Sequence, residues 1–179
     1  MFRKVCIIGC GLIGSSVARG IKKNKLASKV VSSNRSKNTN KKVMNLSIVN
    51  EASSDTKKMV RDSDLVIIAT PLSSYKNVIL TIKNSLKNGA ILTDVGSVKQ
   101  KVISLIEKNI PKNVSWISSH PIAGTEESGP EAGFSELFKN RWCILTPSKQ
   151  SRNQDVKLLE MFWKKLGSKV DIMDAKQHD

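Results

Sequence analysis

The chain has 179 residues, which is enough for one domain with a hydrophobic core. Its hydrophobic fraction of 39% and charged fraction of 25% are typical of a soluble globular protein, and no apolar run is long enough to span a membrane. The net charge is +15, but aromatic residues make up only 4% of the chain and do not interleave with the basic ones as in single-strand binders. We therefore expect no nucleic-acid partner, and a positive surface that attracts anionic small molecules.

The three cysteines, Cys6, Cys10 and Cys143, are an odd number without paired spacing. This pattern argues against a disulfide framework and against a zinc site, so no metal is predicted. The basic and then apolar start, MFRKVCIIG, is short and leads directly into a glycine motif, unlike a signal peptide. A reducing cytoplasm is the simplest setting for such a chain.

Short apolar runs alternate with helical patterns along the chain. The run DLVIIATP is apolar on both faces, as a central parallel strand should be. The predicted strands cover residues 4–8, 29–33, 64–71, 90–94, 114–118, 142–145 and 169–173. The predicted helices begin after the glycine motif and cover 40–46, 73–86, 99–108 and 155–166. This alternation predicts right-handed βαβ units and one α/β domain over residues 1–179, with a Rossmann-type, doubly wound, mostly parallel sheet.

Residues 9–14 read GCGLIG and match the dinucleotide-binding pattern G-x-G-x-x-G. The motif follows a predicted strand and opens a predicted helix, which is the context that its mechanism requires. The first glycine permits the tight turn, the second lets a pyrophosphate approach the backbone, and the third lets helix and strand pack closely. We therefore predict that a dinucleotide binds at Gly9, Gly11, Leu12, Ile13 and Gly14.

The end of the second strand departs from this pattern. An acidic residue is expected there to bind the ribose hydroxyls, but Asn34 takes its place and Arg35 and Ser36 follow. An acid would repel a 2′-phosphate, whereas Arg35 could pair with one bidentately. The sequence therefore favours NADP, and NAD remains open because Asn34 can still bond a ribose hydroxyl.

Four polar features are expected at the carboxyl ends of predicted strands: Thr70 and Pro71, residues 94–97, residues 119–120 and the stretch from Trp142 onward. Ligands of open parallel sheets bind at the carboxyl ends of the strands, so we expect these residues to line one crevice. Ser97 and Gln100 form a capping box, which predicts that Ser97 is the N-cap of the following helix.

His120 follows a predicted strand, precedes Pro121 and enters a glycine-rich loop that reaches Phe138. The proline pushes His120 toward extended geometry and so fixes where its ring points. An imidazole beside a nicotinamide is a natural base for an alcohol that is being oxidised. The residue pattern by itself leaves a structural role for His120 equally open. For His178, the polar residues before it favour a position on the surface.

Five motifs resemble those of the prephenate/arogenate (cyclohexadienyl) dehydrogenases of tyrosine biosynthesis. They are GCGLIGSS (9–16), DLVIIATP (64–71), DVGSVK (94–99), SHPIAGTEESGPEAGFSELFKNRWCILTP (119–147) and HD (178–179). The resemblance implies oxidative decarboxylation of prephenate or arogenate with NAD or NADP. It also implies that His120 takes the proton of the C4 hydroxyl, that Ser97 supports this hydroxyl and the nicotinamide, that Glu126 contributes to the site and that His178 positions the substrate. Residues 119–147 would then be a catalytic loop that walls the nicotinamide end of the crevice.

The resemblance further implies a helical C-terminal domain that dimerises and supplies an arginine for a substrate carboxylate. Nothing in residues 1–179 matches that domain, so a homodimer is expected only when it is attached, and the chain alone is expected to turn over substrate poorly. Two alternatives remain: another NAD(P)-dependent hydroxyacid dehydrogenase, and a non-catalytic or truncated dinucleotide-binding module.

Overall fold

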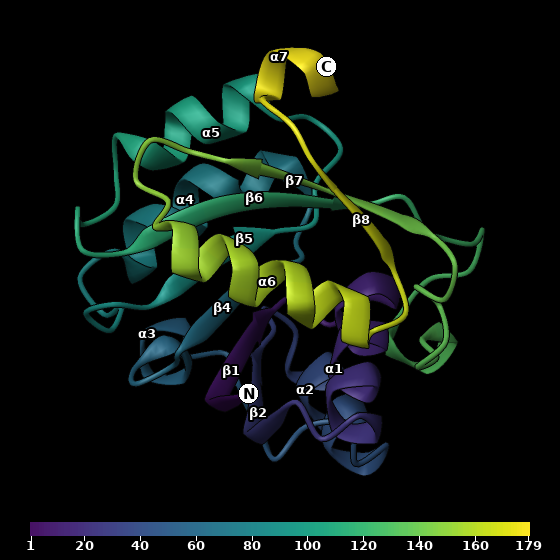
Figure 1. The fold of residues 1–179 in the computed structure, drawn as a ribbon. Coiled ribbons are helices and arrows are strands. Elements are labelled where there is room, and N and C mark those ends of the chain that lie inside the picture. Colours follow the sequence, from purple (N-terminus) through teal and green to yellow (C-terminus); the bar gives the residue numbers. More distant parts are fainter.

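Eight strands form one sheet in the order β3-β2-β1-β4-β5-β6-β7-β8 in the computed structural model, which describes all residues 1–179 (Figure 1). All neighbouring strands are parallel except β6 and β7. The strands are β1 (Phe2–Ile8), β2 (Ala27–Ser33), β3 (Glu51–Ser53), β4 (Leu65–Ile68), β5 (Ile91–Asp94), β6 (Ser115–Pro121), β7 (Trp142–Pro147) and β8 (Lys169–Ile172). The order confirms the predicted doubly wound, mostly parallel α/β fold and places the switch point between β1 and β4.

Helices cover both faces of the sheet. They are α1 (Leu12–Lys23), α2 (Lys37–Asn45), α3 (Thr56–Val60), α4 (Tyr75–Ile82), α5 (Gln100–Glu107), α6 (Asn153–Lys165) and α7 (Ala175–His178), with the 3₁₀ turns η1 (Leu72–Ser74) and η2 (Pro130–Ala132). In Figure 1 the long helix α6 crosses the front of the sheet, while the short helix α7 lies at the top beside α5. None of these helices combines the length and the apolar character that a membrane crossing would need.

Two hydrophobic clusters hold the layers together, one on each face of the sheet. Alternate residues of a strand enter opposite clusters: in β4, Leu65 and Ile67 face α1 and α6, whereas Val66 and Ile68 face α3, α4 and α5. Both sides of the central strands are therefore buried, which explains why DLVIIATP reads as a continuous apolar run.

The structure corrects several predicted boundaries. Strand β3 and helix α3 were not predicted, because three and five residues are too few to show a period. The predicted helix over 73–86 begins as a 3₁₀ turn and its α-helical part ends at Ile82. Strand β6 runs on to Pro121, so His120 lies inside a strand rather than after one.

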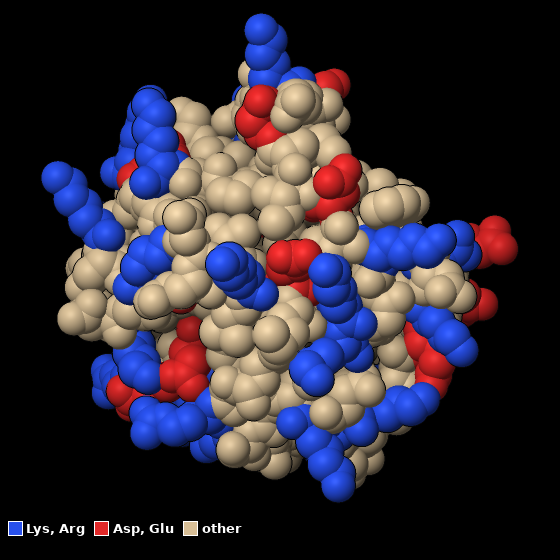
Figure 2. All heavy atoms as spheres, viewed as in Figure 1, with Lys and Arg blue, Asp and Glu red and all other residues tan.

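The basic residues do not gather into one stripe on the face that Figure 2 shows. Lys and Arg spread over most of this face, and acidic side chains lie among them. Several lysines form exposed ion pairs, such as Lys29 and Lys58 with Glu51 and Lys164 with Glu160. Such exposed pairs contribute little to stability. Because the basic residues on the face in Figure 2 are spread out, their charge acts there as a diffuse field.

Candidate active site

The glycine motif forms the turn from β1 to α1, and its three glycines are required for different reasons. Gly9 has φ +92°, a left-handed conformation that side chains rarely adopt. A Cβ on Gly14 would lie 2.0 Å from the carbonyl oxygen of Gly9, so only glycine lets the helix lie this close to the turn. A Cβ on Gly11 would meet nothing within 4 Å, which leaves room for a ligand against the backbone.

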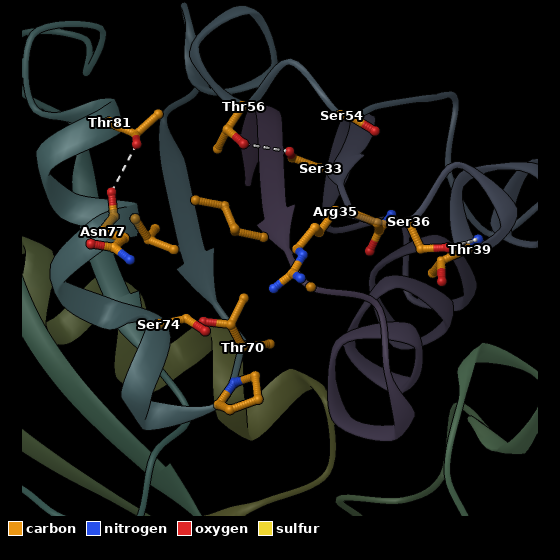
Figure 3. Close-up of a pocket in the computed structure, with 16 residues that line it drawn as sticks. Ser33, Arg35, Ser36, Thr39, Ser54, Thr56, Thr70, Ser74, Asn77 and Thr81 are labelled. Atoms are coloured by element: carbon orange, nitrogen blue, oxygen red, sulfur yellow. Dashed lines mark hydrogen bonds between the residues drawn. The ribbon is translucent and has the colours of Figure 1, made fainter.

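Beside this turn lies a cleft of about 630 Å³ at the carboxyl ends of β1, β2 and β4 (Figure 3). Its lining is rich in hydroxyl groups and holds one charged residue, Arg35. Its hydroxyl-bearing residues are Ser33, Ser36, Thr39, Ser54, Thr56, Thr70, Ser74 and Thr81. Thr70 lines the cleft, and its Oγ1 is buried without a hydrogen-bond partner in the protein.

Asn34 and Arg35 have different roles at the end of β2. The Oδ1 of Asn34 accepts a hydrogen bond from the backbone N–H of Cys10 at 2.7 Å, and its Nδ2 donates to Ser32 Oγ and Asn40 Oδ1. Asn34 is buried at the wall of the cleft, and its amide holds the glycine turn. Arg35 is exposed and extends into the cleft in Figure 3.

The remaining residues predicted to bind the dinucleotide lie close by. Gly9 and Pro71 line the cleft, as do Thr70 and Ser36, and Ser36 also caps α2 by accepting from the Thr39 N–H at 3.3 Å. Leu12 and Ile13 do not line the cleft, because their side chains pack against the core. In the first turn of α1, no side chain caps the helix and no acidic residue is present. The backbone N–H groups of this first turn could therefore bind an anion.

A second groove lies across the carboxyl end of β6. Its lining combines Ser97, His120, His178 and Asp179 with the apolar residues Val98, Ile122, Ile144 and Met173. The predicted single crevice is thus two hollows without a common lining residue in this structure, one lined by residues 8–81 and one by residues 97–179. The groove is open to water, since Ile122 is 51% exposed.

His120 and His178 meet in this groove. The Nδ1 of His120 lies 2.8 Å from the Nε2 of His178, and the Nδ1 of His178 lies 2.9 Å from a carboxylate oxygen of Asp179. The prediction of a surface position for His178 is wrong, because its side chain is only 9% exposed. Burial, with the charge of Lys99 as a second cause, holds the pKa of His120 below its ordinary value of 6.5.

The predicted capping box at Ser97 is also wrong. Helix α5 begins after Lys99, and no side chain of its own segment caps it. The carboxylate of Asp179 accepts from the backbone N–H groups of Lys99 and Gln100 at 3.1 and 3.0 Å. Ser97 is exposed at the rim of the groove, where its hydroxyl remains free for a ligand.

Glu126 is exposed and does not line the groove, so the structure does not bring it to His120. The middle of the loop 119–147 lies against α1 instead of walling the groove. Gly133 sits so close to Ser15 that a Cβ would lie 2.1 Å from its hydroxyl, and Ser16 Oγ accepts from the Phe134 N–H at 3.1 Å. Two acids of this stretch pair with lysines of α1 and α2, Glu136 with Lys23 and Glu131 with Lys42.

Asp94 and Lys99 form a buried ion pair. The pair was not predicted, although both residues belong to the DVGSVK motif. The Nζ of Lys99 lies 3.3 Å from both carboxylate oxygens of Asp94 and donates to Ser118 Oγ and to the Ser119 carbonyl at 2.8 and 2.7 Å. Neither charged side chain is exposed. Tyr75 donates to Asp94 at 3.1 Å, and burial together with this carboxylate raises the pKa of the phenol. The sequence signal for this pair would have been a lysine five residues after an acid at the end of a predicted strand.

The chain was compared with known proteins. The family "Prephenate dehydrogenase, nucleotide-binding domain" matches residues 17–172. A cyclohexadienyl dehydrogenase of Zymomonas mobilis is 35% identical over 179 residues, and a prephenate dehydrogenase of Bacillus subtilis is 30% identical over 176 residues. They are matched over 100% and 98% of this chain, but over only 61% and 47% of their own lengths.

Solved structures show the same relation. The crystal structure of Aquifex aeolicus prephenate dehydrogenase with hydroxyphenyl propionate and NAD⁺ has a TM-score of 0.92 at 27% identity and matches 99% of this chain and 62% of its own. Synechocystis arogenate dehydrogenase has a TM-score of 0.90 at 25% identity, and the match covers 98% of this chain and 61% of that one. The chain thus spans about half to two thirds of the length of these relatives. It belongs to the prephenate dehydrogenase family, whose nucleotide-binding domain it carries.

Proposed function

We propose that this protein is the nucleotide-binding and proton-accepting part of a prephenate or arogenate dehydrogenase. The observation that carries the proposal is the groove at the carboxyl end of β6, which His120 and Ser97 line together with apolar residues. Relatives named cyclohexadienyl, prephenate and arogenate dehydrogenase support this assignment, and in one solved relative both NAD⁺ and a hydroxyphenyl ligand are bound.

The residues of the groove suit an alcohol that must lose its proton while hydride leaves the same carbon. A nicotinamide dinucleotide, when bound, supplies the hydride acceptor. His120 accepts the proton of the C4 hydroxyl through Nε2, and Ser97 hydrogen-bonds the same oxygen. The bond from C1 to the carboxylate breaks, CO₂ leaves with the ring keeping the electron pair, and the ring becomes aromatic. The electron pair from the broken bond makes the C4 oxygen a phenolate, which takes the proton back from His120. The protein therefore mainly orients the substrate and holds one proton during the reaction.

The cleft supports NADP as the preferred cofactor, with NAD as the alternative. No acidic residue lines it, and Arg35 extends into it beyond the end of β2. A guanidinium can bind a 2′-phosphate with two parallel hydrogen bonds. The side-chain amide of Asn34 is already hydrogen-bonded to Cys10, Ser32 and Asn40. It therefore has little capacity left to bond the 2′-hydroxyl of NAD.

Arg35→Ala tests this preference. We expect NADP to bind about 10- to 100-fold more weakly while NAD binding changes little, because a hydrogen bond to a charged group contributes roughly 1.5–3 kcal/mol. Titration of both cofactors would measure the ratio of dissociation constants. Lys37→Ala is the control, since Lys37 is exposed and does not line the cleft. An equal loss for both cofactors would contradict a 2′-phosphate contact at Arg35.

Gly11→Ala tests the location of the pyrophosphate. Gly11 has φ −76° and open space at its Cβ position, so the variant should fold normally. Its methyl group should keep the pyrophosphate off the backbone and weaken both dinucleotides by roughly tenfold or more, the equivalent of about 1.4 kcal/mol. Gly14→Ala is the contrast, because its clash with Gly9 should lower the melting temperature itself. Unaltered dinucleotide affinity in Gly11→Ala would place the pyrophosphate elsewhere.

The pH dependence of turnover should report His120. The base must be neutral to accept a proton, and its pKa is lowered by burial. We therefore expect kcat/KM to rise with pH and to reach its plateau with an apparent pKa below 6.5. If kcat/KM instead rises with an apparent pKa of 6.5 or higher, another group is the base.

Four assays on the full-length gene product decide the activity: prephenate and arogenate, each with NAD and NADP. Formation of reduced cofactor with release of CO₂ in at least one combination supports the proposal. Dinucleotide binding without turnover in all four would favour the non-catalytic module. The open groove and the greater length of the relatives support a second, helical domain that covers the substrate and forms the dimer, and light scattering of the same protein would test the dimer.

A further inference from the structure

Asp179 joins helix α5 to the two histidines. One of its oxygens, Oδ1, accepts from the Lys99 N–H at 3.1 Å and lies 2.9 Å from His178 Nδ1, while Oδ2 accepts from the Gln100 N–H at 3.0 Å. These donors lower the pKa of Asp179 to about 2, so the group is a carboxylate at neutral pH. A carboxylate only accepts hydrogen bonds.

This carboxylate determines which nitrogen of His178 carries hydrogen. Because Asp179 can only accept, Nδ1 of His178 must donate to it. A neutral imidazole has one N–H, so Nε2 of His178 is then an acceptor. This acceptor lies 2.8 Å from Nδ1 of His120.

The same reasoning extends to His120. A hydrogen bond between the two rings needs a hydrogen on one of the two facing nitrogens, and His178 has none to give, so Nδ1 of His120 donates. The remaining nitrogen of His120, Nε2, then carries a lone pair in the groove. We propose that Asp179 is a positioning residue that acts through His178 to hold His120 as the Nδ1–H tautomer, with Nε2 as the proton acceptor.

In this arrangement His178 and Asp179 have different parts to play beside His120. A second histidine alone could donate to His120 as easily as accept from it, and donation would place the hydrogen of His120 on Nε2. The carboxylate removes this ambiguity, in the way that a buried aspartate fixes the tautomer of the histidine in a serine protease triad. That Nε2 receives a substrate proton rests on the proposed function, whereas the tautomer itself does not.

The tautomers can be observed directly, because the chain contains only two histidines. Two-dimensional ¹⁵N–¹H spectra of the histidine-labelled 179-residue protein, recorded at neutral pH without ligands, report which ring nitrogens carry hydrogen. His120→Asn and His178→Gln assign the two rings. We expect Nδ1–H in both. A His120 ring with its hydrogen on Nε2, or one averaged between the two tautomers, would overturn the proposal even if the enzyme proves active.

Asp179→Ala tests the part played by the carboxylate. We expect the His120 signals to shift from the single Nδ1–H tautomer to a mixture. Asp174→Ala is the matched control: Asp174 caps α7 through the Lys176 and Gln177 N–H groups, and this change loosens the same short helix while keeping the Asp179 carboxylate. The control should keep the Nδ1–H form. A mixture in both variants would show that the tautomer follows the order of α7, and an unchanged spectrum in Asp179→Ala would show that Asp179 does not set it; either result rejects the assignment.

Discussion

Lys99→Met should destabilise the domain by about 3–5 kcal/mol, because it removes one partner of a fully buried ion pair and leaves the other charge uncompensated. Asp94 would keep hydrogen bonds from Ser118, the Ser119 N–H and Tyr75, but no cation would face it. Chemical denaturation, followed by far-UV circular dichroism, measures the free energy of unfolding. Lys101→Met is the control on the same helix, since Lys101 is exposed.

The double variant Asp94→Asn with Lys99→Met shows whether the loss comes from the pair or from packing. Replacing both charges should cost much less than the sum of the two single changes, because no unpaired charge remains in the interior. Additive losses would mean that Lys99 contributes through its contacts with Ser118 and Ser119 and not through Asp94.

His120→Asn should reduce kcat by about 10²- to 10⁴-fold, the usual contribution of a positioned general base. Asparagine can still offer an N–H toward His178 Nε2, so the variant removes the Nε2 acceptor without leaving His178 unpartnered. Steady-state rates on the full-length gene product measure the loss.

Cofactor titration supplies the control for this variant. His120 does not line the cleft that holds Arg35 and Thr70, so dinucleotide affinity should stay within about twofold of the unaltered protein, a difference of less than 0.5 kcal/mol. Full turnover in His120→Asn would remove the histidine from the mechanism, and a loss of dinucleotide binding of the same size would point to a structural role.

Features that depend on neighbouring residues could be predicted from the sequence. The glycine turn follows from residues 9–14, and its geometry confirms the reasons given for Gly9 and Gly14. The central strand β4 follows from a continuous apolar run. The chain order of strands and helices then led to the mostly parallel sheet.

Features that depend on distant contacts could not be predicted in this way. The cap of α5 comes from Asp179, which is 80 residues away from Lys99, so the local capping pattern at Ser97 was misleading. His178 looked like a surface residue because its partner, His120, is 58 positions away. In each case a tertiary contact replaced what the local pattern suggested.

The division of the two hollows along the chain has a consequence for synthesis. Every residue that lines the dinucleotide cleft lies within residues 8–81, whereas the groove at His120 needs Ser97 at one end and Asp179 at the other. Domains generally fold as units during synthesis, and both hollows belong to the same domain. The strands that carry the cleft share a core with β6, β7 and α6. The two hollows are therefore expected to form together, after the chain has emerged as far as Asp179.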